Sequence, residues 1–298
     1  MSIIHHLNIM RKAIGHGTLF PKIRHKRMPA PLGSWEAETH GSILTRLSQE
    51  VSWFRHTEHH LSLPSWSDIH IIQLSDLHIR AKDEWLETLC LHLSGLEADI
   101  VVLTGDLVTK NWTTEALRYL LSHLPSSALG TYAILGNWEH WVVPDLQKWR
   151  ELLAEYDVTL LVEEWIELEN LTIVGTDDHL AGKCSPQRWL QELPTKPTLC
   201  LTHSPEIFPL LSQSSLDLIL AGHAHGGQVS LPLLGPVWVP HGTGTFISGW
   251  YIHNQTHLFV SKGLGWSVAP LRLFCTPEIA SIFVRTENKD RSQPQSEI

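Results

Sequence analysis

Several features that would assign this chain to a membrane-spanning, secreted or repetitive class are missing. No apolar run approaches the roughly 18 residues that a membrane-spanning helix needs, and the first residues lack the apolar core of a secretory signal. There is no internal repeat and no low-complexity block. With 298 residues and 43% hydrophobic composition, the chain is expected to form one large α/β domain, or at most two smaller ones.

Cysteine is scarce, with four residues and no CxxC pair. Cys90 and Cys200 lie within apolar runs, where a buried free thiol is usual. The lack of a disulfide framework fits a reducing compartment, so we expect a cytoplasmic protein.

Acidic residues are absent from the first 30 positions, which carry six basic ones. The net charge of -9 therefore divides into +6 for this arm and -15 for the rest, and such an acidic body disfavours nucleic-acid binding. Residues 1–50 are predicted to be a basic N-terminal extension. It is either an ordinary tail or an arm in peripheral contact with the inner face of the membrane. Its basic residues are Arg11, Lys12, Lys22, Arg24, Lys26 and Arg27.

The order of predicted elements is typical of βαβ units. The first predicted strands cover residues 69–75, 99–104 and 131–135, alternating with predicted helices at 85–96, 113–124 and 144–156. Thr113 or Thr114 is the expected N-cap of the second helix. Further strands are predicted at 159–163, 165–169, 171–175, 198–202, 216–220, 258–261 and 279–284, with short helices at 43–54 and 185–193.

Five of these strands are followed by residue types that bind metals. The carboxyl ends of strands in α/β sheets are where sites are built, and two divalent ions about 3.5–4 Å apart need one bridging carboxylate plus imidazole and amide or carboxylate ligands. Asp106 is the natural bridge, because Gly105 permits close approach of the backbone. The predicted ligands are Asp76, His78, Asp106, Asn137, His203, His223 and His225.

Each motif alone has an ordinary alternative. An Asp-Leu-His triplet is commonly a loop, Gly-Asp at a strand end is commonly a turn, and His203 is equally compatible with a core histidine. The ordered occurrence of the whole set at five strand ends favours the metal site.

The motifs DLH (76–78), GD (105–106), GN (136–137), His203 and GHAH (222–225) resemble the calcineurin-like metallophosphoesterase superfamily over roughly residues 50–285. GTDD (175–178), GHAHGGQV (222–229), SKGLG (261–265) and PEI (277–279) resemble a bacterial subgroup of membrane-associated phosphodiesterases. Some members of that subgroup are UDP-2,3-diacylglucosamine pyrophosphatases of lipid A biosynthesis.

The resemblance implies a four-layer α/β sandwich, two mixed β-sheets flanked by helices, over residues 51–286, followed by a polar tail at 287–298. It implies two divalent ions of manganese, iron or zinc, and hydrolysis of a phosphoester or pyrophosphate by metal-bound hydroxide. The substrate would be a small or lipid-linked phosphoester, such as UDP-2,3-diacylglucosamine. The implied ligands are Asp76, His78 and His225 for one ion, Asn137, His203 and His223 for the other, and Asp106 as the bridge.

One position departs from the family pattern. The family usually places a histidine directly after Gly-Asn, where it contacts the phosphate or protonates the leaving group, but here that residue is Trp138. Because an indole only donates a hydrogen bond, we predict that His140, two residues later, is the acid, alongside Asn137 and Asp106 in catalysis. The alternatives for His140 are a surface histidine, with the acid being His179 or His241, or water.

Two other groups have open alternatives. Asp177 and Asp178 either orient a ligand histidine or form a solvated turn. The tryptophans of the C-terminal third either form an apolar wall for a lipid-bearing substrate or pack in the core; they are Trp238, Trp250 and Trp266. Two rival functions remain: a phosphodiesterase acting on nucleotides or nucleic acid, and a non-catalytic metal-binding scaffold, which only Trp138 supports.

The basic extension generates the first testable prediction. Six basic residues near an anionic bilayer attract it by about 1 kcal/mol each. Deleting residues 1–30 is therefore expected to weaken sedimentation with phosphatidylserine vesicles and to leave hydrolysis of a soluble diester intact. Equal sedimentation of the full-length and shortened proteins would make the extension an ordinary tail.

Overall fold

The computed structural model describes residues 18–19, 53–231, 234–267 and 269–286. The tail, most of the N-terminal extension and nearly all of the predicted helix at 43–54 therefore lie outside the described residues. Within the described part of the chain, no helix has both the length and the apolar composition needed to cross a membrane.

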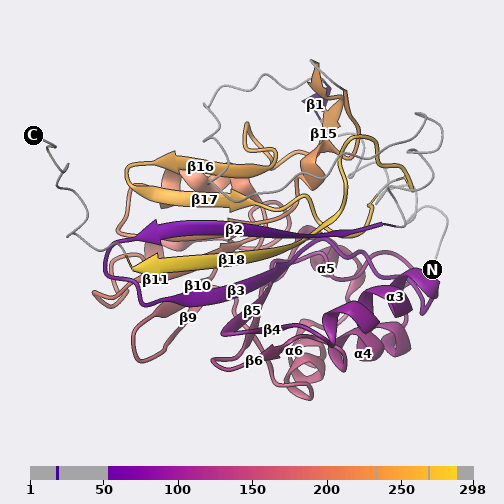
Figure 1. Cartoon of the computed structure of the whole chain (residues 1–298), viewed down its shortest axis with the longest axis horizontal. Coiled ribbons are helices and arrows are strands. Elements are labelled where there is room, and N and C mark those ends of the chain that lie inside the picture. The colour runs from indigo at the N-terminus through magenta and orange to yellow at the C-terminus, as the bar shows by residue number, and fades with distance from the viewer. Residues whose placement is uncertain (1–17, 20–52, 232–233, 268, 287–298) are drawn as a thin grey trace, which may run out of the picture.

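Two six-stranded mixed sheets pack face to face, as the fold prediction required (Figure 1). In the first sheet, β3, β5, β7 and β8 are parallel, and β18 joins β2 to β3. In the second, β10, β11, β12 and β17 are parallel, and β9 and β16 are antiparallel edge strands. The first sheet has the order β2 (Arg55–Leu63), β18 (Glu278–Thr286), β3 (Ile69–Leu74), β5 (Ile100–Leu103), β7 (Thr131–Ala133) and β8 (Val158–Leu160). The second has the order β16 (Gly249–His253), β17 (Thr256–Val260), β12 (Leu218–Ala221), β11 (Thr198–Thr202), β10 (Thr172–Gly175) and β9 (Glu164–Glu167).

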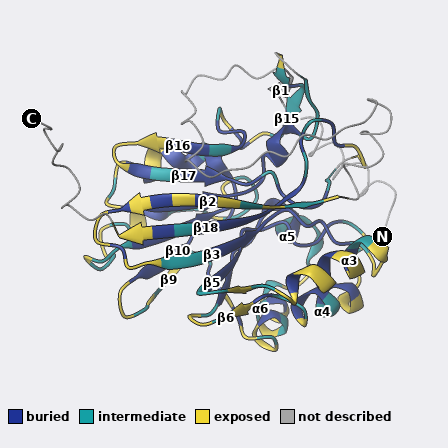
Figure 2. Ribbon diagram, in the orientation of Figure 1, coloured by how far each residue is buried: buried dark blue, intermediate teal, exposed yellow. Residues whose placement is uncertain are grey.

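The central strands are short apolar runs because both of their faces are covered. Ile71 and Val102 of the first sheet pack against Leu199 and Leu220 of the second in a core between the sheets. The strands β5, β10, β11 and β12 are accordingly buried along their whole length (Figure 2). This core holds the two sheets in one relative position, which matters because both contribute to the site below.

Three amphipathic helices cover the outer face of the first sheet. They begin at capping side chains of Asp83, Thr113 and Asp145, each of which accepts a hydrogen bond from a backbone N–H of the first turn. The sequence left two candidates for the N-cap of the second of these helices, and the structure shows that Thr113, not Thr114, is the cap. The helices are α3 (Glu84–Leu93), α4 (Thr114–Leu121) and α6 (Leu146–Ala154).

The outer face of the second sheet is covered mainly by short elements and loops. The helix predicted at 185–193 is only one turn of 3-10 helix followed by turns, and Phe208 and Leu211 supply much of the packing on this side. The elements are η1 (Pro186–Arg188), η2 (Pro205–Ile207), α7 (Phe208–Leu211) and η3 (His225–Gly227).

Several elements were not predicted. In β2, histidine occupies one of the inward positions, so the alternation that marks a strand is weak: His59, Leu61 and Leu63 are buried. The helix α5 (Asn137–Val142) begins directly at a predicted ligand. The remaining short strands are β1 (Thr18–Leu19) with β15 (Trp238–Val239), β4 (Glu97–Ala98) with β6 (Ser126–Ser127), and β13 (Ser230–Leu231) with β14 (Gly235–Pro236).

Candidate metal centre

The seven predicted ligands converge at one edge of the sandwich. They follow β3, β5 and β7 of the first sheet and β11 and β12 of the second, and each is at most 4% exposed. Six of them form two buried groups whose ligand atoms lie within 4.8 Å of one another. The groups are Asp76, His78 and His225, and Asp106, His203 and His223.

The first group has the spacing of ligands around one ion. The Nε2 atoms of His78 and His225 are 3.0 Å apart, and Nε2 of His225 is 3.4 Å from Oδ1 of Asp76. Two nitrogens that each lie about 2.1 Å from an ion and subtend a right angle would be about 3 Å apart. The group therefore accommodates a divalent ion without rearrangement.

The second group shares an oxygen with the first. Oδ2 of Asp106 is 3.2 Å from Nε2 of His203 and 3.7 Å from Nε2 of His78, and Nε2 of His203 is 3.2 Å from Nδ1 of His223. One carboxylate oxygen thus faces both groups, which is the position of a bridging ligand.

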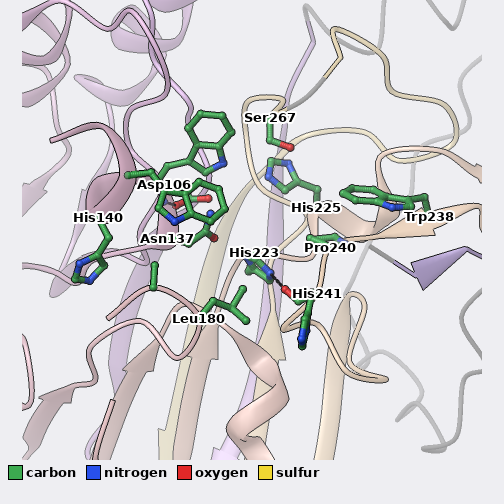
Figure 3. A pocket seen from close by; sticks show the side chains of 13 residues that line it. Asp106, Asn137, His140, Leu180, His223, His225, Trp238, Pro240, His241 and Ser267 are labelled. Atoms are coloured by element: carbon green, nitrogen blue, oxygen red, sulfur yellow. Dashed lines mark hydrogen bonds between the residues drawn. The ribbon is translucent and has the colours of Figure 1, made fainter. Parts of the chain in front are cut away.

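Asn137 supplies an independent test of the fit to metal. Its Oδ1 is buried and has no hydrogen-bond partner among the described residues. Because an unpaired buried carbonyl oxygen is costly, this atom fits a ligand of the ion held by the second group. Asn137 and Asp106 both line the same pocket (Figure 3).

Backbone carbonyls hold two ligand histidines in the tautomer that a metal requires. Nδ1 of His203 donates to the Thr104 carbonyl over 2.8 Å, and Nε2 of His223 donates to the His241 carbonyl over 2.7 Å. Each bond leaves the lone pair of the opposite nitrogen facing the site. His225 differs, because its Nδ1 lies 3.3 Å from the fully buried guanidinium of Arg272.

Five of the seven ligands have left-handed backbone conformations, which cost free energy for residues other than glycine. Such strain persists only where the surrounding structure imposes it, and here it turns the side chains into the site. The five are Asp76, His78, Asp106, His223 and His225, with φ between 48° and 68°.

Two glycines allow the loops to approach. Gly105 has φ +86°, and a Cβ there would lie 2.7 Å from Nδ1 of His203. A Cβ on Gly136 would collide with the carboxylate of Asp106. The close backbone approach predicted beside Asp106 is therefore present on both of the loops that meet there.

Glu139 joins these two loops, and it was not among the predicted site residues. Its fully buried carboxylate accepts hydrogen bonds from the backbone N–H groups of Asp106 and Gly136 on one oxygen, and from Leu107 and Val108 on the other. The glutamate three residues after Gly136 is in the position of a capping box for α5, which is the signal that could have found it.

Burial dominates the electrostatics of the site except at His203, where burial is outweighed by the carboxylate of Asp106, which raises the pKa of that histidine well above its usual value. Burial raises the pKa of Asp76, and it raises the pKa of Asp106 to about 7. It also lowers the pKa of His223 to about 3, and those of His78 and His225 well below the usual value. Neutral imidazoles offer lone pairs, and divalent cations would offset the cost of the buried carboxylates.

His140 lies beside the centre and is paired with Asp177. Its Nε2 is 2.7 Å from Oδ1 of Asp177. Burial alone would lower the pKa of His140, but the hydrogen bond and charge of Asp177 outweigh burial and raise it, with Asp178 and Glu139 adding in the same direction. Asp177 is buried, so the solvated-turn interpretation is wrong for it. Asp178 is also buried and accepts from the Ser204 hydroxyl over 2.9 Å, next to the ligand His203.

The tryptophans predicted as one group lie in different surroundings. Trp250 packs in the core between the sheets and donates from Nε1 to His59. The indole of Trp266 stacks against Arg80, whose Cζ is 3.5 Å from the ring centroid. Only Trp238 lines the pocket, where it joins Trp138. Of the alternative acids, His179 is exposed and His241 lines the pocket.

The chain was compared with known proteins. The family model for calcineurin-like phosphoesterases matches residues 69–227. The uncharacterized metallophosphoesterase YkuE of Bacillus subtilis is 28% identical over 229 residues, 73% of this chain and 79% of that protein. Phosphodiesterase YaeI of Escherichia coli is 29% identical over 245 residues, 78% of this chain and 89% of that protein. An uncharacterized metallophosphoesterase of Campylobacter jejuni is 31% identical over 224 residues, 71% of this chain but 58% of that protein.

Asp106→Asn tests the bridging position. Asparagine can keep the acceptor for the Trp138 N–H, 2.8 Å from Oδ1 in the native protein, but it lacks the charge that offsets two dications. We expect at least one ion per chain to be lost in mass-spectrometric metal analysis, together with nearly all activity. Asp157→Asn is the matched control, since Asp157 is exposed and has φ 56° against 54° for Asp106. Full metal occupancy with normal turnover in Asp106→Asn would refute the bridge.

Proposed function

The chain belongs to the calcineurin-like phosphoesterase family, a family of metal-dependent hydrolases that use two divalent ions, and from that premise we propose how its residues divide the work. Asp76, His78 and His225 hold one ion. The second ion is held by His203, His223 and Asn137, with Asp106 between the two. The ligands of each ion come from both sheets, so the site exists only in the folded sandwich.

The observation that carries this proposal is the position of one oxygen. Oδ2 of Asp106 faces His203 at 3.2 Å and His78 at 3.7 Å, so the two ligand groups meet at a single carboxylate. Manganese, iron and zinc all accept this set of nitrogen and oxygen donors. When bound, the ions polarise the phosphoryl group and activate water.

The protein's own contribution is to position the phosphate and to move a proton. Glu139 and the bond from the Trp138 N–H to Asp106 fix the loop beside Asp106, and this places α5 at the wall of the pocket. We assign His140 as the acid: Asp177 engages Nε2, which leaves Nδ1 to donate. Water gives up one proton to solvent as its oxygen bonds to phosphorus, the bond to the leaving oxygen breaks, and that oxygen takes the proton from His140, which is reprotonated from solvent.

The substrate is proposed to be a small or lipid-linked phosphoester. Support comes from the likeness to a phosphodiesterase and from the apolar residues of the pocket wall. UDP-2,3-diacylglucosamine, cyclic nucleotides and simple diesters are the candidates to compare. Peripheral membrane contact through the basic extension is proposed from its charge of +6 over the first 30 residues.

The rival functions receive less support. A non-catalytic scaffold rests on Trp138 alone, whereas the complete ligand set favours an enzyme. A nucleic-acid substrate is disfavoured by the charge of -15 beyond the first 30 residues.

Turnover of bis-p-nitrophenyl phosphate tests the function. The purified protein, supplied in turn with manganese, iron and zinc, is expected to release nitrophenol, and chelation followed by readdition of metal should abolish and restore release. Absence of turnover with every metal, in a protein that binds two ions, would favour the scaffold.

His140→Ala tests the acid. A positioned acid contributes about 10²–10⁴ in rate, so kcat should fall by about that factor for alkyl leaving groups and much less for p-nitrophenol, with metal content unchanged. Exposed His92 provides the control substitution, His92→Ala.

The pH profile distinguishes an acid from a structural histidine. Because Asp177 raises the pKa of His140, the acid stays protonated to higher pH, and the rate with alkyl leaving groups should fall as pH rises through that pKa. Asp177→Asn should move this fall to lower pH. Wild-type rates on both leaving groups in His140→Ala would exclude His140.

A further inference from the structure

The pocket over the metal ligands has a volume of about 550 Å³ and two kinds of wall. The ligands Asp106, Asn137, His223 and His225 form one part (Figure 3). Apolar side chains form most of the rest. They are Trp138, Trp141, Leu180, Ala181, Trp238 and Pro240.

The aromatic part of the wall is held in place beside the metal ligands. The ring of Trp138 contacts that of His78 edge-on, with centroids 5.6 Å apart, and pairs with Trp141 at 5.6 Å. The backbone N–H of Trp138 donates to Oδ1 of Asp106. An apolar group on a phosphate bound at the ligands would therefore meet a rigid aromatic surface. Trp238 lies across the site, beyond His225 as seen from Asn137 (Figure 3).

The wall offers little positive charge, because its one assigned acid, His140, is paired with the carboxylate of Asp177. No lysine or arginine lines the pocket in the described part of the chain. The guanidinium of Arg80 stacks on Trp266 and donates to the carbonyls of His78 and Trp266. Arg272 is fully buried and bonds to backbone carbonyls behind His225.

The charge balance limits the substrate. Two divalent ions, offset by the carboxylates of Asp76 and Asp106, leave a net charge of about +2 at the centre. This positive charge neutralises the charge of one singly charged phosphate group together with that of an attacking hydroxide. The second phosphate of a pyrophosphate or nucleoside diphosphate would enter a largely apolar wall to which the described residues contribute no lysine or arginine, and this costs free energy.

We infer that the pocket selects phosphodiesters that carry one negative charge and an apolar substituent, and that it discriminates against pyrophosphates. This inference rests on the proposed function and narrows its substrate class. The apolar substituent has two sources, an aromatic ring or an alkyl chain, and both would pack against Trp138, Trp141 and Trp238.

The test uses the full-length, manganese-loaded enzyme and diesters that share one leaving group. Methyl, hexyl and phenyl p-nitrophenyl phosphate differ only in the group that remains, so leaving-group chemistry is constant. We expect kcat/KM to be about tenfold or more higher for the hexyl or phenyl ester than for the methyl ester, mainly through KM. A preference for phenyl indicates stacking and one for hexyl indicates a chain. UDP-glucose, a pyrophosphate, should be hydrolysed more slowly than the preferred diester.

Substitutions of the pocket tryptophans test which side chains cause the preference for the hexyl or phenyl ester. Trp238→Ala should reduce the ratio of preferred to methyl ester severalfold, and Trp238→Phe should restore most of it, because a flat ring is retained. Trp53→Ala is the control, since Trp53 is 54% exposed and is not among the lining residues. Metal analysis and circular dichroism of each variant identify a folding defect, in which case Trp141→Ala replaces Trp238→Ala.

The outcomes separate the two proposals. Equal kcat/KM for all three diesters, or hydrolysis of UDP-glucose as fast as the best diester, would overturn the inference and leave the phosphodiesterase function intact. An unchanged ratio in a folded Trp238→Ala and Trp141→Ala would also overturn it. No turnover of any diester with any metal would overturn both.

Discussion

The structure around the centre depends on the burial of two carboxylates, Asp76 and Asp106, which are at most 2% exposed. Within the described residues the opposing charge that reaches Asp76 comes from histidine and from the buried Arg272, and these lower its pKa less than burial raises it. Burial raises the pKa of both groups. Cations that bind at this site would therefore stabilise the folded protein. The strained backbone of the ligands and the close contact at Gly136 are tolerated because the surrounding sheets and Glu139 fix these loops.

The two sheets have a functional relation as well as a structural one. Strands β3, β5 and β7 of the first sheet and β11 and β12 of the second end at the same edge, so neither sheet alone carries a complete ligand set. The apolar core between the sheets, which includes Ile71 and Leu220, fixes their relative position. A change that shifted one sheet by an ångström would alter the distance between Asp106 and His203 without touching a ligand.

The loop after β7 is where this chain differs from the family pattern, and this difference changes the wall of the pocket. Trp138 occupies the position of the usual histidine and presents an aromatic wall beside His78, while its backbone N–H still holds Asp106. A titratable group is present two residues further along α5, where His140 pairs with Asp177. Acid function and apolar recognition are thus proposed to lie on one short helix.

The sequence alone determined the βαβ order, because apolar runs and helical periodicity are local patterns. The two-sheet class came from the resemblance carried by Asp-Leu-His, Gly-Asp, Gly-Asn, His203 and Gly-His-Ala-His. The sequence also identified seven residues that the fold brings together, since carboxyl ends of parallel strands share an edge. Tertiary structure decided the rest. Three features depend on contacts between segments about 30 or more residues apart, or on backbone atoms that carry no sequence signal. They are the pairing of His140 with Asp177, the four hydrogen bonds of Glu139 and the burial of Arg272. The strand β2 escaped notice for a related reason: its one buried histidine, His59, is covered by Trp250 and Phe259 of the second sheet, which lie far along the chain.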